Sequence, residues 1–266
     1  MKVDVNGVKY NVAVRGKGIP LVMLHGFSES MNTFRSINSE EYQVIYIDLI
    51  GHGKTDSPKE IKYYNLHHLL KDINFIINRI TKEKYVIYGY SMGGRIALAY
   101  SFIYSSEIKG LILESASYGE TDLIKRKNRR LSDYRLAKKI ESNGIKWFVD
   151  YWTNIPIFDS QKFLDEETRN EIRDLKFNNN INGLTKSLIG FSQGRLPALK
   201  EKIPEIKIKT LYISGELDSK YTSMGQEFKK MNSDITHKIV KSAGHNVHIE
   251  RPYEVKKIIN KFIRMG

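Results

Sequence analysis

Short apolar runs alternate with amphipathic stretches along most of this chain of 266 residues. The apolar runs Ile19–Leu24 and Val44–Leu49 are each followed by a turn that contains glycine and histidine. Runs of this kind are typical of strands in a sheet that helices cover on both faces. Leu66–Ile80 instead has the spacing of an amphipathic helix.

The same alternation continues to the end of the chain. Further strands are predicted at Tyr85–Tyr88, Leu111–Leu113, Thr210–Ser214 and Ile235–Val240. Further helices are predicted at Ser91–Tyr104, Ser223–Met231 and Pro252–Phe262. This order predicts an α/β fold with a mostly parallel, doubly wound sheet. Near the start, alternating segments flank Asn6-Gly7, which is a strong hairpin signal.

The stretch from 120 to 199 breaks this rhythm because it contains helical patterns and no clear strand. The helical patterns are separated at Asn143-Gly144, Ile155-Pro156 and Asn178–Asn180. We interpret this stretch as a helical lid insertion over one edge of the sheet, and call it the lid segment. Residues 1–119 and 200–266 are then expected to form the α/β core.

The composition narrows the class of protein. Apolar residues make up 41% of the chain, and there is no cysteine, which excludes disulfides and thiolate ligands. No stretch approaches the roughly 20 apolar residues of a membrane span, and we expect a soluble, cytoplasmic protein. No His-x-His or His-Glu-x-x-His pattern occurs, so we expect neither a metal nor another cofactor.

The formal net charge of +13 admits more than one interpretation. Basic clusters at Lys125–Lys127, Arg129-Arg130 and Lys138-Lys139 lie in one segment with helical spacing. No nucleic-acid-binding module is recognisable, so we expect no nucleic-acid partner. A lysine-rich solvated surface and the attraction of an anionic substrate remain as the two explanations.

The run Gly89-Tyr90-Ser91-Met92-Gly93 lies between a predicted strand and a predicted helix. This arrangement is the nucleophile elbow, in which glycines permit a tight turn that exposes the serine above the sheet. The elbow predicts an α/β-hydrolase fold with Ser91 at the head of a catalytic triad. The alternative is a serine that only caps the helix.

A serine hydroxyl needs a base, and the base needs an orienting carboxylate. In this fold the acid and then the histidine follow the serine along the chain. Asp218 follows the strand at Thr210–Ser214, with Glu216 as a local competitor, and His245 follows the last strand. His248 is expected in the first turn of the next helix.

The backbone N–H groups of Phe27 and Met92 are expected to form an oxyanion hole. Such donors stabilise an ester intermediate and an enolate equally well, so the triad alone does not specify hydrolysis. Arg95 lies one helical turn after Ser91, where its guanidinium can bind a substrate carboxylate. A surface arginine is the competing interpretation.

Several motifs together resemble one family, the 2-succinyl-6-hydroxy-2,4-cyclohexadiene-1-carboxylate synthases of menaquinone biosynthesis. The resemblance runs from His25 to the end of the chain, and Ser91–Arg95 and the lid motifs discriminate this family from other α/β-hydrolases. The segments that carry it are Tyr90–Arg95, Leu113–Ser117, Arg129–Asp133, Phe148–Trp152, Ile155–Phe158, Asn178–Asn180, Gly215–Lys220 and Ala243–His248.

The resemblance implies a lyase that removes pyruvate from 2-succinyl-5-enolpyruvyl-6-hydroxy-3-cyclohexene-1-carboxylate. It implies that the triad abstracts a proton, with either Ser91 or His245 as the immediate base. The substrate is a small anionic tricarboxylate, and no membrane partner is expected. The residues implied to bind the substrate are Arg95, Arg129, Tyr90, Trp152 and Lys176, the last of which replaces a family arginine.

Two other functions remain open at this point. One is a serine esterase or thioesterase, and the other is a non-catalytic receptor that uses the same fold to bind a ligand. The sequence also leaves open whether the protein is a monomer or a homodimer.

Overall fold

The computed structural model describes residues 1–38 and 41–264. In this part of the chain eight strands form one sheet in the order β1-β2-β4-β3-β5-β6-β7-β8. Strands β3 to β8 pair in parallel, whereas β1 and β2 form the predicted antiparallel hairpin. The predicted mostly parallel, doubly wound sheet is therefore confirmed. The strands are β1 Lys2–Val5, β2 Val8–Arg15, β3 Ile19–Leu24, β4 Tyr42–Ile47, β5 Tyr85–Tyr90, β6 Ile108–Glu114, β7 Thr210–Gly215 and β8 Thr236–Val240.

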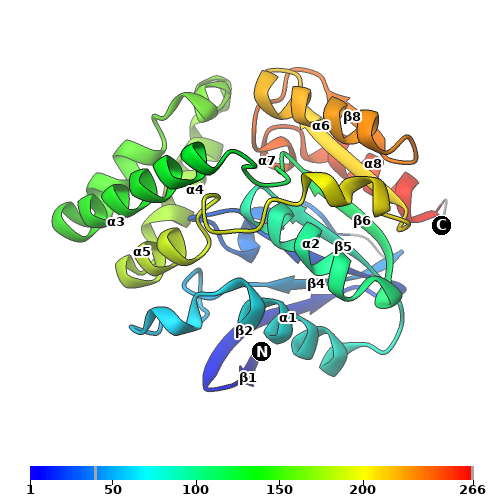
Figure 1. Cartoon of the computed structure of the whole chain (residues 1–266), viewed down its shortest axis with the longest axis horizontal. Helices are drawn as coiled ribbons and strands as arrows, with labels where there is room; N and C mark the ends of the chain where they lie inside the picture. Colours follow the sequence, from blue (N-terminus) through cyan, green and yellow to red (C-terminus); the bar gives the residue numbers. More distant parts are fainter. Residues whose placement is uncertain (39–40, 265–266) are drawn as a thin grey trace.

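Helices cover both faces of the sheet (Figure 1). The helices of the α/β core are α1 Leu66–Ile80, α2 Met92–Ile103, α6 Ser219–Met231, α7 Val247–Glu250 and α8 Pro252–Arg264. Successive residues of a strand point to opposite faces, and β3 divides accordingly. Val22 and Leu24 pack in the cluster that includes α1, α2 and α6 side chains, and Leu21 and Met23 pack in the cluster of α8. Burial on both faces explains why the central strands are apolar throughout.

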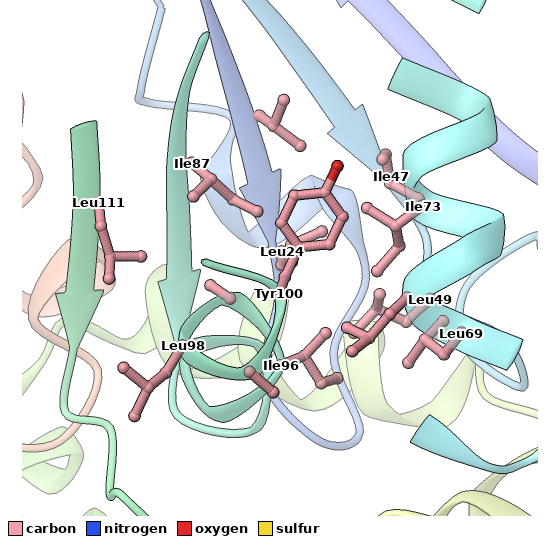
Figure 2. Close-up of a cluster of buried hydrophobic side chains, with 14 of the residues drawn as sticks. Leu24, Ile47, Leu49, Leu69, Ile73, Ile87, Ile96, Leu98, Tyr100 and Leu111 are labelled. Carbon is pink, nitrogen blue, oxygen red and sulfur yellow. The ribbon is translucent and has the colours of Figure 1, made fainter. Parts of the chain in front are cut away.

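Figure 2 shows part of the first cluster. Leu24 and Ile87 of the sheet lie beside Ile73 of α1 and Ile96 of α2, and all four side chains are fully buried. Helix α1 packs its apolar side, which includes Ile73, against the sheet and exposes its other side, where Phe75 is 48% exposed. The apolar contacts of this cluster hold α1 and α2 against the sheet. Helix α2 begins at Met92, directly after Ser91.

The helices of the lid segment lie together at one end of the sheet (Figure 1). They are α3 Leu123–Trp152, α4 Glu166–Phe177 and α5 Ile181–Gly190, with a 3-10 stretch at Pro156–Phe163. Helices α3 and α5 form a small core of their own that consists of Ala137, Ile140, Phe148, Val149, Leu184 and Leu188. Within the described residues, no helix has the length and apolar character needed to cross a membrane.

Local sequence explains the breaks between these helices. Gly144 has φ 80° and ψ −179°, which lie outside the helical region, so α3 consists of two helices that meet at a kink, and the predicted separation at Asn143-Gly144 is confirmed. The asparagine run is a turn, as predicted. Asn178 caps the end of α4, and the Asn180 side chain accepts a hydrogen bond from the Gly183 N–H at the start of α5.

The packing of α1 generates a stability prediction. Replacing Ile73 with alanine is expected to lower the free energy of unfolding by about 2–5 kcal/mol, because it leaves a cavity between helix and sheet. Phe75→Ala on the exposed side of the same helix is the matched control, with an expected change within about 0.5 kcal/mol. Urea unfolding followed by circular dichroism measures both, and equal losses would contradict the assigned packing.

Candidate active site

The turn between β5 and α2 holds Ser91 in an uncommon backbone conformation. Its φ is 49° and its ψ is −105°, in the left-handed half of the map that costs a non-glycine residue free energy. The surrounding packing enforces this conformation. A Cβ atom at Gly93 would meet the carbonyl oxygen of Leu24, and one at Gly89 would meet the carbonyl oxygen of Gly93. Only glycine fits at these two positions, which is the physical basis of the sequence motif.

The structure brings the three predicted triad residues together. His245 Nε2 lies 3.0 Å from Ser91 Oγ, and His245 Nδ1 lies 2.7 Å from Asp218 Oδ2. A carboxylate can only accept, so the imidazole carries its proton on Nδ1 and leaves Nε2 to accept from the serine hydroxyl. Asp218 Oδ1 also accepts from the Tyr221 N–H, which fixes the carboxylate at the start of α6. Glu216, the competitor, is exposed and accepts from the Ser242 N–H instead.

Two other histidines form hydrogen bonds to other residues of the protein. His248 lies in the first turn of α7, as expected, and its backbone N–H and ring Nδ1 both contact Glu114 Oε1. Burial acts to lower the pKa of His248, but the Glu114 carboxylate, together with the smaller effects of Glu29 and Glu250, raises the pKa above its usual value. His25 Nε2 accepts from the Leu49 N–H, so its ring connects two loops of the fold.

A cavity of about 270 Å³ opens beside Ser91 between the α/β core and the lid segment. Aromatic side chains form much of its wall: Phe27, Tyr90, Trp152, Phe158, Phe191 and Tyr221. Its charged lining consists of Arg95, Arg129 and Lys220 together with Asp133. The excess of positive charge suits a ligand with several negative charges.

Phe27 and Met92, the predicted oxyanion-hole residues, both line the cavity. Met92 is the first residue of α2, so its N–H has no acceptor inside the helix. Within the described residues, neither N–H group donates to a protein acceptor. Both therefore remain available to a negatively charged oxygen beside Ser91.

The two predicted arginines differ in their protein partners. Arg129 Nε bonds both oxygens of Asp133 at 2.9 Å, and its Nη1 bonds Gln193. Arg95 is half-buried, and its Nε is buried without a hydrogen-bond partner in the described part of the chain. Burial lowers the pKa of the Arg95 guanidinium, and the positive charge of Arg129 acts in the same direction. Arg95 is therefore the group that gains most from an incoming anion.

The remaining predicted site residues fall into two groups. Tyr90 and Trp152 line the cavity, and the Trp152 ring packs on Phe27 with a centroid distance of 5.2 Å. Lys176 does not line it. Its ammonium lies 5.7 Å from the centre of the Phe158 ring, and its side chain is buried.

Sequence reasoning missed Lys220 as a member of the site. This residue lies on the first turn of α6, two positions after Asp218, and its side chain lines the cavity. The available signal was its place within the Gly215–Lys220 motif, next to a triad acid. The part of the chain that the structure describes contains no cluster of three or more His, Cys, Asp or Glu side chains suited to a metal ion.

An elbow serine with an aligned histidine and aspartate, on a parallel sheet, defines a class of protein. A family model of the α/β hydrolase fold matches residues 19–252, so the chain is a member of that fold family. A structure described as MenH from S. aureus superposes with a TM-score of 0.90 at 30% identity, covering 96% of this chain and 98% of that one. A thermophilic esterase from Thermogutta terrifontis has a TM-score of 0.85 over 100% of this chain and 98% of its own, but at 22% identity it shows the fold alone.

Sequence relatives define the family more narrowly. The chain is 37% identical to the "Putative 2-succinyl-6-hydroxy-2,4-cyclohexadiene-1-carboxylate synthase" of Bacillus subtilis (strain 168), over 97% of this chain and 96% of that protein. It is 29% identical to the synthase of that name from Salmonella agona (strain SL483), over 92% and 94% of the two chains. The chain belongs to the 2-succinyl-6-hydroxy-2,4-cyclohexadiene-1-carboxylate synthase family.

The Nε of Arg95, which has no hydrogen-bond partner within the described residues, leads to a prediction that separates stability from binding. Arg95→Met is expected to leave the ligand-free unfolding free energy unchanged or to raise it by roughly 1 kcal/mol, because a poorly paired buried charge is removed. Succinate is expected to raise the melting temperature of the wild type and not that of the variant. Thermal unfolding with and without succinate measures both effects.

Arg135→Met, an exposed arginine of α3, is the control for the change in net charge and keeps the response to succinate. A large loss of stability in ligand-free Arg95→Met would contradict the assignment, because it would mean that the protein itself satisfies this guanidinium.

Proposed function

We propose that this enzyme eliminates pyruvate from 2-succinyl-5-enolpyruvyl-6-hydroxy-3-cyclohexene-1-carboxylate and thereby forms 2-succinyl-6-hydroxy-2,4-cyclohexadiene-1-carboxylate in menaquinone biosynthesis. The observation that carries the proposal is the meeting of an aligned triad with three cationic side chains in one cavity. The names of the family members support the same reaction. In this proposal the lid segment, residues 120–199, closes the cavity over a core formed by 1–119 and 200–266.

The reaction requires the loss of a ring proton α to the succinyl ketone. The aligned Asp218–His245–Ser91 relay supplies the base, with His245 receiving the proton directly or through Ser91. The C–H electrons form an enolate, whose oxygen the N–H groups of Phe27 and Met92 stabilise. The enolate then re-forms the ketone, the ring gains its second double bond, and the C–O bond to enolpyruvate breaks.

The leaving enolpyruvate is protonated on carbon to give pyruvate, and the imidazolium of His245 can return the proton taken from the ring. The enzyme therefore ends the cycle in its starting protonation state. No bond from the substrate to Ser91 Oγ is needed. An ion pair with Asp218 stabilises the imidazolium during the reaction.

The substrate carries three carboxylates, and the cavity offers three cationic partners. We assign Arg95, Arg129 and Lys220 to these groups because all three line the cavity. A guanidinium binds a carboxylate through two parallel hydrogen bonds, whereas the Lys220 ammonium acts as a mobile point charge. Tyr90 and Trp152 complete the wall beside the ring. Anchoring all three carboxylates fixes the ring proton over the base.

The direct test is an assay of pyruvate release and diene absorbance with the enolpyruvyl substrate. Wild-type enzyme is expected to produce both, and Ser91→Ala and His245→Ala are each expected to lower kcat by about 10²- to 10⁴-fold, because the relay is interrupted. Unchanged unfolding midpoints for both variants exclude a folding defect as the cause.

The alternatives predict other outcomes of the same experiment. Rapid hydrolysis of p-nitrophenyl esters without pyruvate release would replace the lyase by a serine esterase. Tight binding of the substrate without turnover would favour the ligand-binding receptor.

Lys220 provides a separate test of the charge assignment. Lys220→Met is expected to raise KM about tenfold with kcat nearly unchanged, because an exposed ammonium that only anchors a carboxylate contributes equally to substrate and transition state. Lys229→Met, on the same helix and without a place in the cavity, is the matched control. An equal fall in kcat and kcat/KM for Lys220→Met would place the ammonium in the transition state instead.

A further inference from the structure

The histidine of the triad lies in a loop whose backbone must be held in place by its neighbours. His245 lies between β8 and α7, just before the helix begins. Within the described residues, neither the N–H nor the C=O group of His245 forms a hydrogen bond to the protein. Its imidazole nevertheless lies 3.0 Å from Ser91 Oγ and 2.7 Å from Asp218 Oδ2. Both distances are those of good hydrogen bonds, so contacts of the adjacent residues must fix the loop.

Glu250 binds the backbone on both sides of His245. Its Oε2 accepts from the Gly244 N–H at 2.7 Å, and its Oε1 accepts from the Asn246 N–H at 3.3 Å. One carboxylate thus holds the residue before the histidine and the residue after it. Glu250 is 5% exposed and Asn246 is fully buried, so water competes little for these two bonds.

The capping of a helix accounts for only one of these bonds. Asn246 is the N-cap residue of α7, and a glutamate in the first turn of a helix commonly accepts from the N-cap N–H. Gly244 lies two residues before the cap, and its bond to Glu250 is the shorter of the two. The carboxylate therefore reaches across His245 to the loop that precedes the helix.

The rest of this loop is attached to the triad acid and to the lid segment. The carbonyl oxygen of Ala243 accepts from the Leu217 N–H at 2.8 Å, one residue before Asp218. A Cβ atom at Gly244 would collide with Ser160 Oγ of the lid segment, so only glycine permits this close contact. The loop of Asp218 therefore fixes one end of the histidine loop, and Glu250 fixes the part that carries the imidazole.

A carboxylate suits this position because both of its oxygens accept hydrogen bonds. An amide offers one acceptor, and its NH₂ group would face one of the two N–H groups. Burial raises the pKa of Glu250, and the bonds from the Gly244 and Asn246 N–H groups oppose that rise. A buried N–H group that loses its acceptor is unfavourable. Loss of the carboxylate is therefore expected to let the loop move.

We propose that Glu250 is a positioning residue for the triad. Its carboxylate binds the two N–H groups that flank His245 and so keeps the imidazole between Ser91 and Asp218. Glu250 does not line the cavity and acts only through the backbone of the loop. The expected effect on pyruvate release rests on the proposed function, whereas the effect on the position of the imidazole does not.

The kinetic test compares two variants of Glu250 with the wild type. Glu250→Gln is expected to lower kcat for pyruvate release about tenfold, equivalent to about 1.4 kcal/mol, with KM nearly unchanged because the groups that anchor the substrate are untouched. Glu250→Asp keeps the charge but is one carbon atom shorter, so it cannot reach both N–H groups and is expected to lose activity as well. Glu254→Gln, which removes an exposed carboxylate of α8, is the matched control and is expected to keep wild-type kinetics.

Proton NMR tests the position of the imidazole without a substrate. The His245 Nδ1 proton, bonded to Asp218, is expected to give a low-field resonance that is identified by its absence from His245→Ala. This resonance is expected to persist in Glu254→Gln and to broaden or disappear in Glu250→Gln. The Gly244 N–H is expected to exchange slowly with solvent in the wild type. This last measurement needs no variant, so it tests the proposal even if Glu250→Gln does not fold.

Three results would overturn the positioning role. A lowered unfolding midpoint of Glu250→Gln, with unchanged kcat and an unchanged imidazole resonance, would leave a purely structural role. Full activity of Glu250→Asp would show that the negative charge alone acts on His245. Fast exchange of the Gly244 N–H in the wild type would show that Glu250 does not hold the loop. If the wild type releases no pyruvate, the proposed function fails on its own, and the NMR measurements then decide the role of Glu250.

Discussion

The geometry of the site depends on the close packing of the β5–α2 turn against the end of β3. Gly89 and Gly93 allow backbone atoms to approach where any side chain would collide, and this approach holds Ser91 at φ 49°. The strained turn directs the hydroxyl toward His245 and places the Met92 N–H at the free start of a helix. Since β3 and β5 are neighbouring parallel strands, the loop with Phe27 emerges at the same edge. One packing constraint therefore positions the base relay and both candidate oxyanion donors.

The lining of the cavity has more positively than negatively charged side chains. Arg95 is half-buried, and its Nε has no hydrogen-bond partner in the part of the chain that the structure describes. Burial lowers the pKa of its guanidinium, and the charge of Arg129 adds a smaller effect in the same direction. A partly buried guanidinium without a partner for its Nε lowers the stability of the free protein, and an anion that binds to it raises the stability again.

Much of the fold was predictable because it follows from local patterns. The observed bounds of β3 and α1 equal the predicted ones, and the strand–elbow–helix order located Ser91, Asp218 and His245 in chain order. What could not be predicted depends on contacts between distant segments. Nothing in the sequence around Lys176 distinguishes a side chain that lines the cavity from one that is buried against the Phe158 ring without lining it.

The triad and the candidate oxyanion donors are equally suited to an ester and to an enolate, so the choice between hydrolysis and elimination must come from elsewhere in the cavity. Hydrolysis requires the carbonyl carbon over Ser91 Oγ and a path for water. Elimination requires a C–H bond in that position and a leaving group held across the ring. Arg95, Arg129 and Lys220 can impose the second arrangement because carboxylates at separate points of a small ring fix its orientation. Aromatic side chains of the lid segment, Trp152, Phe158 and Phe191, form part of the wall of the same cavity. The cationic lining, rather than the triad, is therefore the part of the structure that favours the lyase.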